Sequence, residues 1–153
     1  MNYEKNTLNF DWVLINQLAV GSFPKTSVHF QILKKNRISS ILNLCDPAEG
    51  ELSRQFKENF HCENYVLPDH RNKRFPNENE IDSATNLLED LMIRGSVYVH
   101  CFAGVERSPL ICISYLMKHK NLEKQDALEY LMQIHSSTNP LKGQLETLSK
   151  LRK

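Results

Sequence analysis

The stretch that most constrains the fold of this sequence runs from Val97 to Pro109 and reads VYVHCFAGVERSP. It opens with β-branched and aromatic residues that favour a buried strand, and from Ser108 onward the chain is apolar enough to predict a helix. The loop between them carries Cys101 at one end, a single glycine at Gly104 and Arg107 at the other end. A strand, a short loop and a helix N-terminus in this order place a thiol and a guanidinium around a space the size of one small anion.

This arrangement favours one kind of chemistry. Backbone N–H groups and the helix dipole create a positive field at a helix N-terminus, and such a field favours the thiolate form of a cysteine. An arginine offers a planar fork of N–H donors that matches the oxygens of a phosphate. The sequence therefore predicts that Cys101 is a nucleophile in a phosphate-binding loop. Taken alone, Cys101 would more often be a structural cysteine, and the register of Gly104, Arg107 and Ser108 favours the functional interpretation.

The rest of the chain alternates predicted strands and helices. Apolar periodicity and breaking residues predict strands at residues 12–15, 18–20, 38–44, 63–67 and 96–100, and helices at residues 26–36, 51–59, 77–94, 108–117, 123–135 and 141–151. Such alternation predicts an α/β fold with a central, mostly parallel sheet flanked by helices. The helix at residues 108–117 is apolar almost all round, which predicts a buried central helix.

Bulk properties place the chain in a broad class. Its 153 residues predict a single domain, with residues 1–10 loosely held. The formal net charge of +1 argues against wholesale binding of nucleic acid. No apolar run approaches the roughly 18 to 20 residues of a membrane span, and the first residues lack the pattern of a signal peptide. A cytoplasmic location is therefore expected.

The four cysteines, Cys45, Cys62, Cys101 and Cys112, include no Cys-x-x-Cys pair. A zinc site usually shows such close ligand pairs, so the sequence does not favour one. We expect three of the four thiols to be core residues.

The loop also carries a recognisable signature. Residues 100–108, HCFAGVERS, match the pattern His-Cys-x-x-Gly-x-x-Arg-Ser/Thr. In this the chain resembles the cysteine-dependent protein tyrosine phosphatase superfamily, and in length and layout its compact, atypical dual-specificity branch, over roughly residues 10 to 150. The resemblance implies a phosphotyrosine phosphatase-like fold.

The resemblance implies a role for each position of the loop. Cys101 attacks phosphorus as the thiolate and forms a phosphocysteine intermediate. Arg107 binds two phosphate oxygens and holds them more tightly as charge develops in the transition state. Ser108 donates to the cysteine sulfur when it leaves, and His100 orients the loop. Backbone N–H groups bind the phosphate along the loop, at Phe102, Ala103, Gly104, Val105, Glu106 and Arg107.

Cleavage of a phosphate ester also requires a proton for the leaving oxygen, which an aspartate on a neighbouring loop can supply. Asp69 follows a predicted strand in the order Leu-Pro-Asp-His and resembles the family's placement of its acid. Asp46, after another predicted strand, is the competing candidate, and Asp82 falls inside a predicted helix, facing away. The structural alternative for Asp69 is an ordinary turn aspartate beside a proline.

Three further features near the loop have less specific interpretations. The basic run at residues 71–74 is either a solvated face or an approach for acidic phosphosubstrates. Glu106 departs from the commonest family pattern, and we expect its side chain to point away from the loop interior, toward a basic neighbour. Gln144 is a candidate to position water, as a glutamine does in the larger tyrosine phosphatases.

The predicted function is a protein phosphatase that acts on phosphotyrosine and on phosphoserine or phosphothreonine. One alternative is a phosphatase of a non-protein substrate, such as an inositol phospholipid or an RNA 5′ phosphate, although the loop lacks the lysines that phosphoinositide-directed members often carry. The other is a phosphate-binding module without catalysis. We expect a monomer that needs no metal or other cofactor and has no nucleic-acid or membrane partner.

Overall fold

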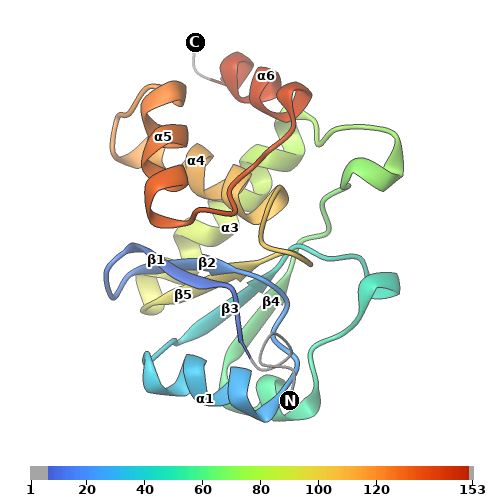
Figure 1. Cartoon of the computed structure of the whole chain (residues 1–153), viewed down its shortest axis with the longest axis vertical. Coiled ribbons are helices and arrows are strands. Elements are labelled where there is room, and N and C mark those ends of the chain that lie inside the picture. Colours follow the sequence, from blue (N-terminus) through green and yellow to red (C-terminus); the bar gives the residue numbers. More distant parts are fainter. Residues whose placement is uncertain (1–6, 152–153) are drawn as a thin grey trace.

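The structure, a computed structural model that describes residues 7–151, is built on one five-stranded sheet (Figure 1). The strands lie in the order β1-β2-β5-β3-β4, and β1 is antiparallel to β2 while the other neighbours are parallel. This confirms the predicted α/β fold with a mostly parallel sheet. The strands are β1 (Phe10–Leu14), β2 (Leu18–Gly21), β3 (Ser40–Asn43), β4 (His61–Asn64) and β5 (Val97–His100).

Helices cover both faces of this sheet. Figure 1 shows α3, α4, α5 and α6 on one face and α1 on the other. None of the helices in residues 7–151 combines the length and hydropathy needed to cross a lipid bilayer. The helices are α1 (Ser27–Lys35), α2 (Arg54–Asn59), α3 (Glu78–Arg94), α4 (Arg107–His119), α5 (Lys124–Ile134) and α6 (Lys142–Leu151), with short 3₁₀ turns η2 (Pro47–Glu49) and η3 (His70–Asn72).

The strand β5 and the helix α4 form the centre of the molecule. All four residues of β5 are buried between β2 and β3, and α4 is buried without interruption from Arg107 to Met117. A helix that is apolar on every side requires burial on every side, so the prediction of a buried central helix is confirmed. The loop between β5 and α4 is consequently held at both ends by the most buried elements of the fold.

Two predicted segments differ from the observed ones by three residues at one end, and the others by two residues or fewer. The strand predicted at residues 63–67 is β4 at His61–Asn64, because its parallel ladder with β3 spans only the four residues of that strand. The helix predicted at residues 51–59 begins only at Arg54. Residues 51–53 belong to no helix or strand. The short 3₁₀ turn η2 before them ends at Glu49 and is followed by Gly50, which has a φ of 137°.

Two residues of the segment predicted to be loosely held, Asn9 and Phe10, contact the fold. The N–H of Asn9 donates to Ser22 Oγ at 3.2 Å, and Phe10 already belongs to β1. Residues 1–6 of that predicted segment lie outside the described residues.

Sheet register sets the position of the site. Gly21 at the end of β2 and Asn43 at the end of β3 both lie opposite His100, the last residue of β5. The segments that follow these three parallel strands therefore leave the sheet at the same edge. Crevices at the carboxyl ends of parallel strands are the usual ligand sites of open α/β sheets.

Candidate active site

Cys101 is the first residue after β5, and only 2% of it is exposed. Its Sγ lies 3.2 Å from Oγ of Ser108, in the first turn of α4. The Ser108 hydroxyl also lies 3.2 Å from the carbonyl oxygen of Gly21. A thiolate only accepts hydrogen bonds, so this hydroxyl is placed to donate to the sulfur whenever the sulfur is charged.

The carbonyl groups of the loop are turned outward by donors from four other parts of the chain. The carbonyl oxygens of Phe102, Ala103, Gly104 and Val105 accept, in that order, from the Phe23 N–H (3.0 Å), Asn9 Nδ2 (3.3 Å), His135 Nε2 (2.7 Å) and the Asn139 N–H (2.8 Å). Among the described residues, the N–H groups of residues 102–107 have no hydrogen-bond acceptor. Successive unpaired N–H groups form an anion-binding nest, so the loop has the construction of a phosphate site.

Gly104 allows this loop to lie against β2. Its φ of 76° falls in the left-handed region, and a Cβ added there would lie 2.7 Å from the carbonyl carbon of Gly21. A backbone atom cannot move aside as a flexible side chain does, so a larger residue would displace the loop.

Arg107 closes the far end of the loop with a side chain only 4% exposed. Its Nη1 donates to Glu49 Oε2 at 2.9 Å and its Nη2 to Oε1 at 2.7 Å, a bidentate pair. The carbonyl oxygens of Leu44 and Leu67 also accept from Nη1, at 3.4 and 3.3 Å. Arginine has five N–H donors, so these contacts leave the Nε–H and one Nη2–H for two oxygens of a bound anion.

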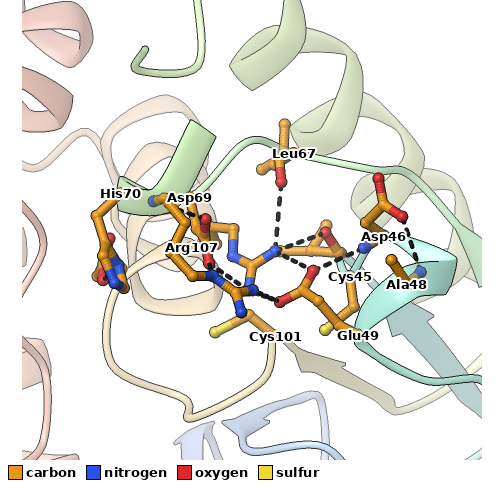
Figure 2. Close-up of polar contacts among 12 residues, drawn as sticks. Cys45, Asp46, Ala48, Glu49, Leu67, Asp69, His70, Cys101 and Arg107 are labelled. Carbon is orange, nitrogen blue, oxygen red and sulfur yellow. Dashed lines mark hydrogen bonds and ion pairs between the residues drawn. The ribbon is translucent and has the colours of Figure 1, made fainter. Parts of the chain in front are cut away.

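Glu49 is the buried partner that holds this guanidinium (Figure 2). It lies at the end of η2, where it forms a reciprocal capping box with Asp46. Burial opposes its ionisation, but the hydrogen bonds from Arg107 and the Asp46 N–H outweigh that effect and hold the pKa of Glu49 below its usual range. A second cation, Arg71, donates to Glu49 Oε1 at 2.8 Å. The carboxylate therefore fixes one edge of the Arg107 fork and leaves the other edge open.

Asp69 lies beside the same cluster. It caps η3, accepts from the Arg71 N–H at 2.9 Å and from Arg71 Nε at 2.8 Å, and its Oδ2 is 3.7 Å from Arg107 Nη2. Burial raises the pKa of Asp69, but the two hydrogen bonds from Arg71 and the charge of Arg107 lower it by more than burial raises it. The pKa of Asp69 is therefore below its ordinary value. In this state Asp69 is a carboxylate held next to the loop.

His100, directly before Cys101, is fully buried and packs edge-on against Phe23 and face-on against Tyr98. Its Nδ1 lies 3.0 Å from the carbonyl oxygen of Cys101, to which it donates. Burial lowers the pKa of His100 to about 4. The ring is therefore neutral near neutral pH and contacts the loop through one N–H group.

A cavity of about 230 Å³ opens over the loop. Its walls are the loop residues other than Gly104, together with the acid-bearing segment Asp69, His70 and Arg71. A larger cavity of about 660 Å³ lies over η2, α2 and β4 and is lined by no residue of the loop. The smaller cavity is the one that brings a thiol, a guanidinium and a carboxylate together.

Family comparison agrees with this construction. The family model described as "Dual specificity phosphatase, catalytic domain" matches residues 18–153 of the chain. The chain belongs to this family. The match covers all the elements that form the loop and the Asp69 segment, from β2 to the end of the chain.

Individual relatives of this dual-specificity phosphatase domain are similar over shorter stretches. Dual specificity protein phosphatase 5 of Rattus norvegicus is 52% identical over 46 residues, 30% of this chain and 12% of that protein. A probable dual specificity protein phosphatase of Dictyostelium discoideum is 29% identical over 108 residues, 71% of this chain and 25% of that protein. The chain thus spans only a fraction of the length of these relatives.

A solved structure supports the fold. The structure of PTPMT1 in complex with PI(5)P superposes with a TM-score of 0.79 at 18% identity, over 93% of each chain. Together with the family model, this shows that the chain has the phosphotyrosine phosphatase-like fold of compact dual-specificity phosphatases.

The two competing candidates for the acid lie outside the cavity over the loop. Asp46 is exposed and uses its carboxylate to cap η2 through the Ala48 N–H at 2.8 Å. Asp82 lies exposed on α3, and it lines a separate cavity against α6. Of the three aspartates, the structure brings only Asp69 to the cavity over the loop.

The basic run after Asp69 is mostly engaged within the chain. Arg71 binds Asp69 and Glu49, and Arg74 forms a bidentate pair with Glu80 at 2.7 and 2.9 Å. Because their charges are balanced by neighbouring carboxylates, these two arginines attract an approaching anion less than the sequence alone suggests.

Glu106 connects three parts of the site. Its Oε2 lies 2.6 Å from His70 Nδ1, and its Oε1 lies 3.4 Å from Nε2 of the buried Gln144. Gln144 also accepts from the Leu141 N–H at 2.7 Å. The carboxylate of Glu106 is thus directed at a basic neighbour, and the Gln144 amide is occupied by two protein contacts.

The other three cysteines have the environment of core thiols. Cys45 and Cys112 are buried, and Cys62 is half-buried with its Sγ near two backbone carbonyls. Burial raises the pKa of all three thiols, that of Cys45 to about 12, which keeps them protonated. Among residues 7–151, no three histidine, cysteine, aspartate or glutamate side chains are grouped as metal ligands would be.

Sequence reasoning missed the residues that support the loop from a distance. Glu49 had a local signal, because Asp46 and Glu49 have the spacing of a capping box directly after a strand. Asn9, His135 and Asn139 had none, since their contact with the loop depends on the strand order and on the position of α5. A sequence shows that such polar residues exist but not which backbone group they reach.

Proposed function

We propose that this chain is a phosphatase that hydrolyses phosphotyrosine, and phosphoserine or phosphothreonine, in proteins through a phosphocysteine intermediate. The observation that carries the proposal is the run of loop N–H groups that have no acceptor among the described residues, with Cys101 at one end and the half-occupied fork of Arg107 at the other. Asp69 and Ser108 complete the set of groups that such a reaction requires. The proposal needs no metal ion, because the nest and the guanidinium neutralise the phosphate.

In the first step the phosphate dianion binds against the N–H groups of residues 102–107. The Nε–H and the remaining Nη2–H of Arg107 bind two of its oxygens, and their hold tightens as charge moves onto these oxygens. The Cys101 thiolate forms the S–P bond while the ester P–O bond breaks. Asp69, protonated in the substrate complex, transfers its proton to the leaving oxygen.

In the second step water hydrolyses the phosphocysteine. Asp69, now a carboxylate, takes a proton from the water as its oxygen forms a bond to phosphorus. The S–P bond breaks, and the electron pair returns to the Cys101 sulfur. The Ser108 hydroxyl, 3.2 Å away, donates to that sulfur and stabilises the departing thiolate.

Asp69 must change its protonation state between the free and the bound enzyme. In the free chain Arg71 and Arg107 lower its pKa. A bound phosphate brings up to two negative charges against Arg107, which offsets the attraction between that guanidinium and the Asp69 carboxylate. Substrate binding therefore favours the protonated acid at the moment when a proton is needed.

Replacing Asp69 with asparagine tests this role. We expect kcat to fall by about 10²- to 10³-fold for an alkyl phosphate such as phosphoserine peptide, because its alkoxide leaves poorly without a proton. For an activated aryl phosphate the loss should be about tenfold or less. The alkaline decline of kcat should also disappear, since no group remains to lose the proton. Equal losses on both substrates would contradict the assignment, and Asp46→Asn serves as the matched control.

The cavity supports a broad choice of phosphorylated residue. The cavity of about 230 Å³ is open at the surface, and Phe102 on its rim is 45% exposed. An exposed aromatic face can pack against a phosphotyrosine ring. The open rim leaves room for the shorter phosphoserine and phosphothreonine side chains to reach the loop.

One observation favours a second candidate. PTPMT1, which shares the fold, is described in complex with PI(5)P. An inositol phospholipid is therefore the alternative substrate class, although the loop positions between Cys101 and Arg107 contain no lysine to bind its additional phosphates.

A side-by-side assay separates these proposals. The purified chain is incubated with phosphotyrosine and phosphothreonine peptides, with phosphoinositide vesicles and with RNA bearing a 5′ phosphate, each with and without EDTA. We expect the greatest kcat/KM on phosphopeptides and no loss with EDTA. Faster hydrolysis of the lipid or the RNA would show that the preferred substrate is not a phosphoprotein. Loss of activity in the presence of EDTA would exclude the metal-free mechanism. Absence of turnover on every substrate would indicate a binding module.

A further inference from the structure

His135 supports the phosphate loop from behind and is not part of the proposed chemistry. It is the residue directly after α5, and none of its side chain is exposed. Its Nε2 lies 2.7 Å from the carbonyl oxygen of Gly104, and its Nδ1 lies 2.7 Å from Oδ2 of Asp11 on β1. One imidazole ring thus joins the middle of the loop to a carboxylate on a distant strand.

The hydrogen-bond partners of the two ring nitrogens indicate the charge of the His135 ring. A carbonyl oxygen only accepts hydrogen bonds, so Nε2 must carry a proton to approach Gly104 at 2.7 Å. The Asp11 carboxylate also only accepts, so Nδ1 must carry a proton as well. A neutral imidazole has one N–H group, and a ring that donates from both nitrogens is the imidazolium cation.

The surroundings of His135 agree with a cation. Ser137 Oγ lies 3.1 Å from Nε2, but it also lies 3.4 Å from the Gly104 oxygen, which can take its proton. The ring stands at the carboxyl end of α5, where the helix dipole favours positive charge. Asp11 is its ion-pair partner among the described residues, with a side chain 40% exposed.

The charge of His135 can affect the loop because the peptide group whose oxygen it contacts also carries a loop N–H group. The Gly104 carbonyl belongs to the peptide whose N–H is that of Val105, one of the loop N–H groups without a protein acceptor. A charged donor on the carbonyl oxygen polarises the peptide and makes its N–H a stronger donor, as in any hydrogen-bonded chain. The effect reaches an anion in the loop without the histidine touching it.

We propose that His135 is a positioning residue that, as a cation paired with Asp11, strengthens oxyanion binding by the loop through the Gly104–Val105 peptide. The proposal rests on the proposed function, because it assigns a task to the same loop. It also gives the described N-terminal strand β1 a role in the site, since Asp11 stabilises the charge of the ring.

The substitution Asp11→Asn tests the charge while keeping a hydrogen-bonding side chain. The amide can turn its Nδ2 toward Nδ1 of a neutral His135, so that Nε2 still donates to Gly104 and only the positive charge is lost. We expect the Kd for inorganic tungstate, measured by calorimetry on the full chain, to rise by about three- to tenfold. Asp11→Glu, which retains the carboxylate, should stay near the original value.

The sign of the change distinguishes this proposal from general electrostatics. Removing a negative charge from any protein should tighten the binding of an anion, not weaken it. Asp126→Asn, an exposed aspartate on α5, is therefore the matched control and should leave Kd unchanged or slightly lower. Tighter or unchanged tungstate binding by Asp11→Asn would overturn the proposal. Thermal unfolding of each variant confirms that it is folded under the conditions of the assay.

A spectroscopic measurement reads the charge directly. In ¹H–¹⁵N correlation spectra of the original chain at neutral pH, both ring nitrogens of His135 should have the shift of a protonated nitrogen, and in Asp11→Asn only one should. An unprotonated ring nitrogen in the original chain would overturn the proposal. Tungstate binding needs no turnover, so a chain that binds it but hydrolyses nothing would refute the proposed function alone. A chain that binds no tungstate would refute both.

Discussion

Replacing Cys101 with serine is expected to lower turnover of every phosphomonoester by at least about 10⁴-fold while tungstate or phosphate still binds. A serine hydroxyl carries its proton near neutral pH and is a far weaker nucleophile than a thiolate. The nest of N–H groups and the Arg107 fork stay intact, because neither contacts the substituted atom through a hydrogen bond. Turnover is measured under single-turnover conditions, and binding by calorimetry.

Cys62→Ser is the matched control for this experiment. It removes a half-buried thiol on β4, away from the loop, and should leave kcat/KM within about twofold. Residual turnover above about one per cent in Cys101→Ser, with Cys62→Ser unaffected, would remove Cys101 from the role of nucleophile.

Replacing Arg107 with lysine is expected to lower kcat/KM by about 10³-fold, although the charge is retained. The guanidinium binds Glu49 with one edge and offers two N–H donors to the phosphate with the other, and an ammonium cannot do both. Most of the loss should appear in kcat, since the bidentate contact strengthens in the transition state.

The same substitution should lower the stability of the fold. The side chain of Glu49 is only 7% exposed, and lysine leaves part of its carboxylate without a partner, at a cost of about 1 to 3 kcal/mol in the free energy of unfolding. Urea denaturation therefore has to accompany the kinetics. Arg74→Lys is the control, because Arg74 makes a comparable bidentate pair with Glu80 outside the loop and its replacement should change kcat/KM by less than about twofold. A loss of kcat/KM below about tenfold for Arg107→Lys would refute the proposal that the guanidinium binds two phosphate oxygens.

Much of the fold could be predicted from local patterns. The helix α3 has its start signal at Asn77 and Glu80 and its stop at Gly95, and the structure places both ends there. The central helix α4 was predicted from its lack of a polar face. The end of β4 was not predictable in the same way, because the length of a strand depends on how far its neighbour continues.

The same distinction between local patterns and long-range contacts applies to the site. Cys101, Gly104, Arg107 and Ser108 lie within eight consecutive residues, so their spacing alone indicates the loop and its chemistry. The Asp69 candidate was supported by its position after a strand, but the structure was needed to place Asp46 and Asp82 away from the cavity over the loop. The charges of the basic run at residues 71–74 were visible in the sequence, but the carboxylates that pair with Arg71 and Arg74 were not.

The sequence by itself determined that a strand, an anion-sized loop and a buried helix follow one another with a thiol and an arginine at the ends. These features are local, because backbone periodicity and residue type decide them within a dozen positions. Only the tertiary structure decided that Glu49 fixes Arg107 and that Asn9, His135 and Asn139 turn the loop carbonyls outward. Those contacts join residues 31 to 94 positions apart. They depend on the strand order, which brings the carboxyl ends of β2, β5 and β3 to one edge of the sheet, and on the position of α5.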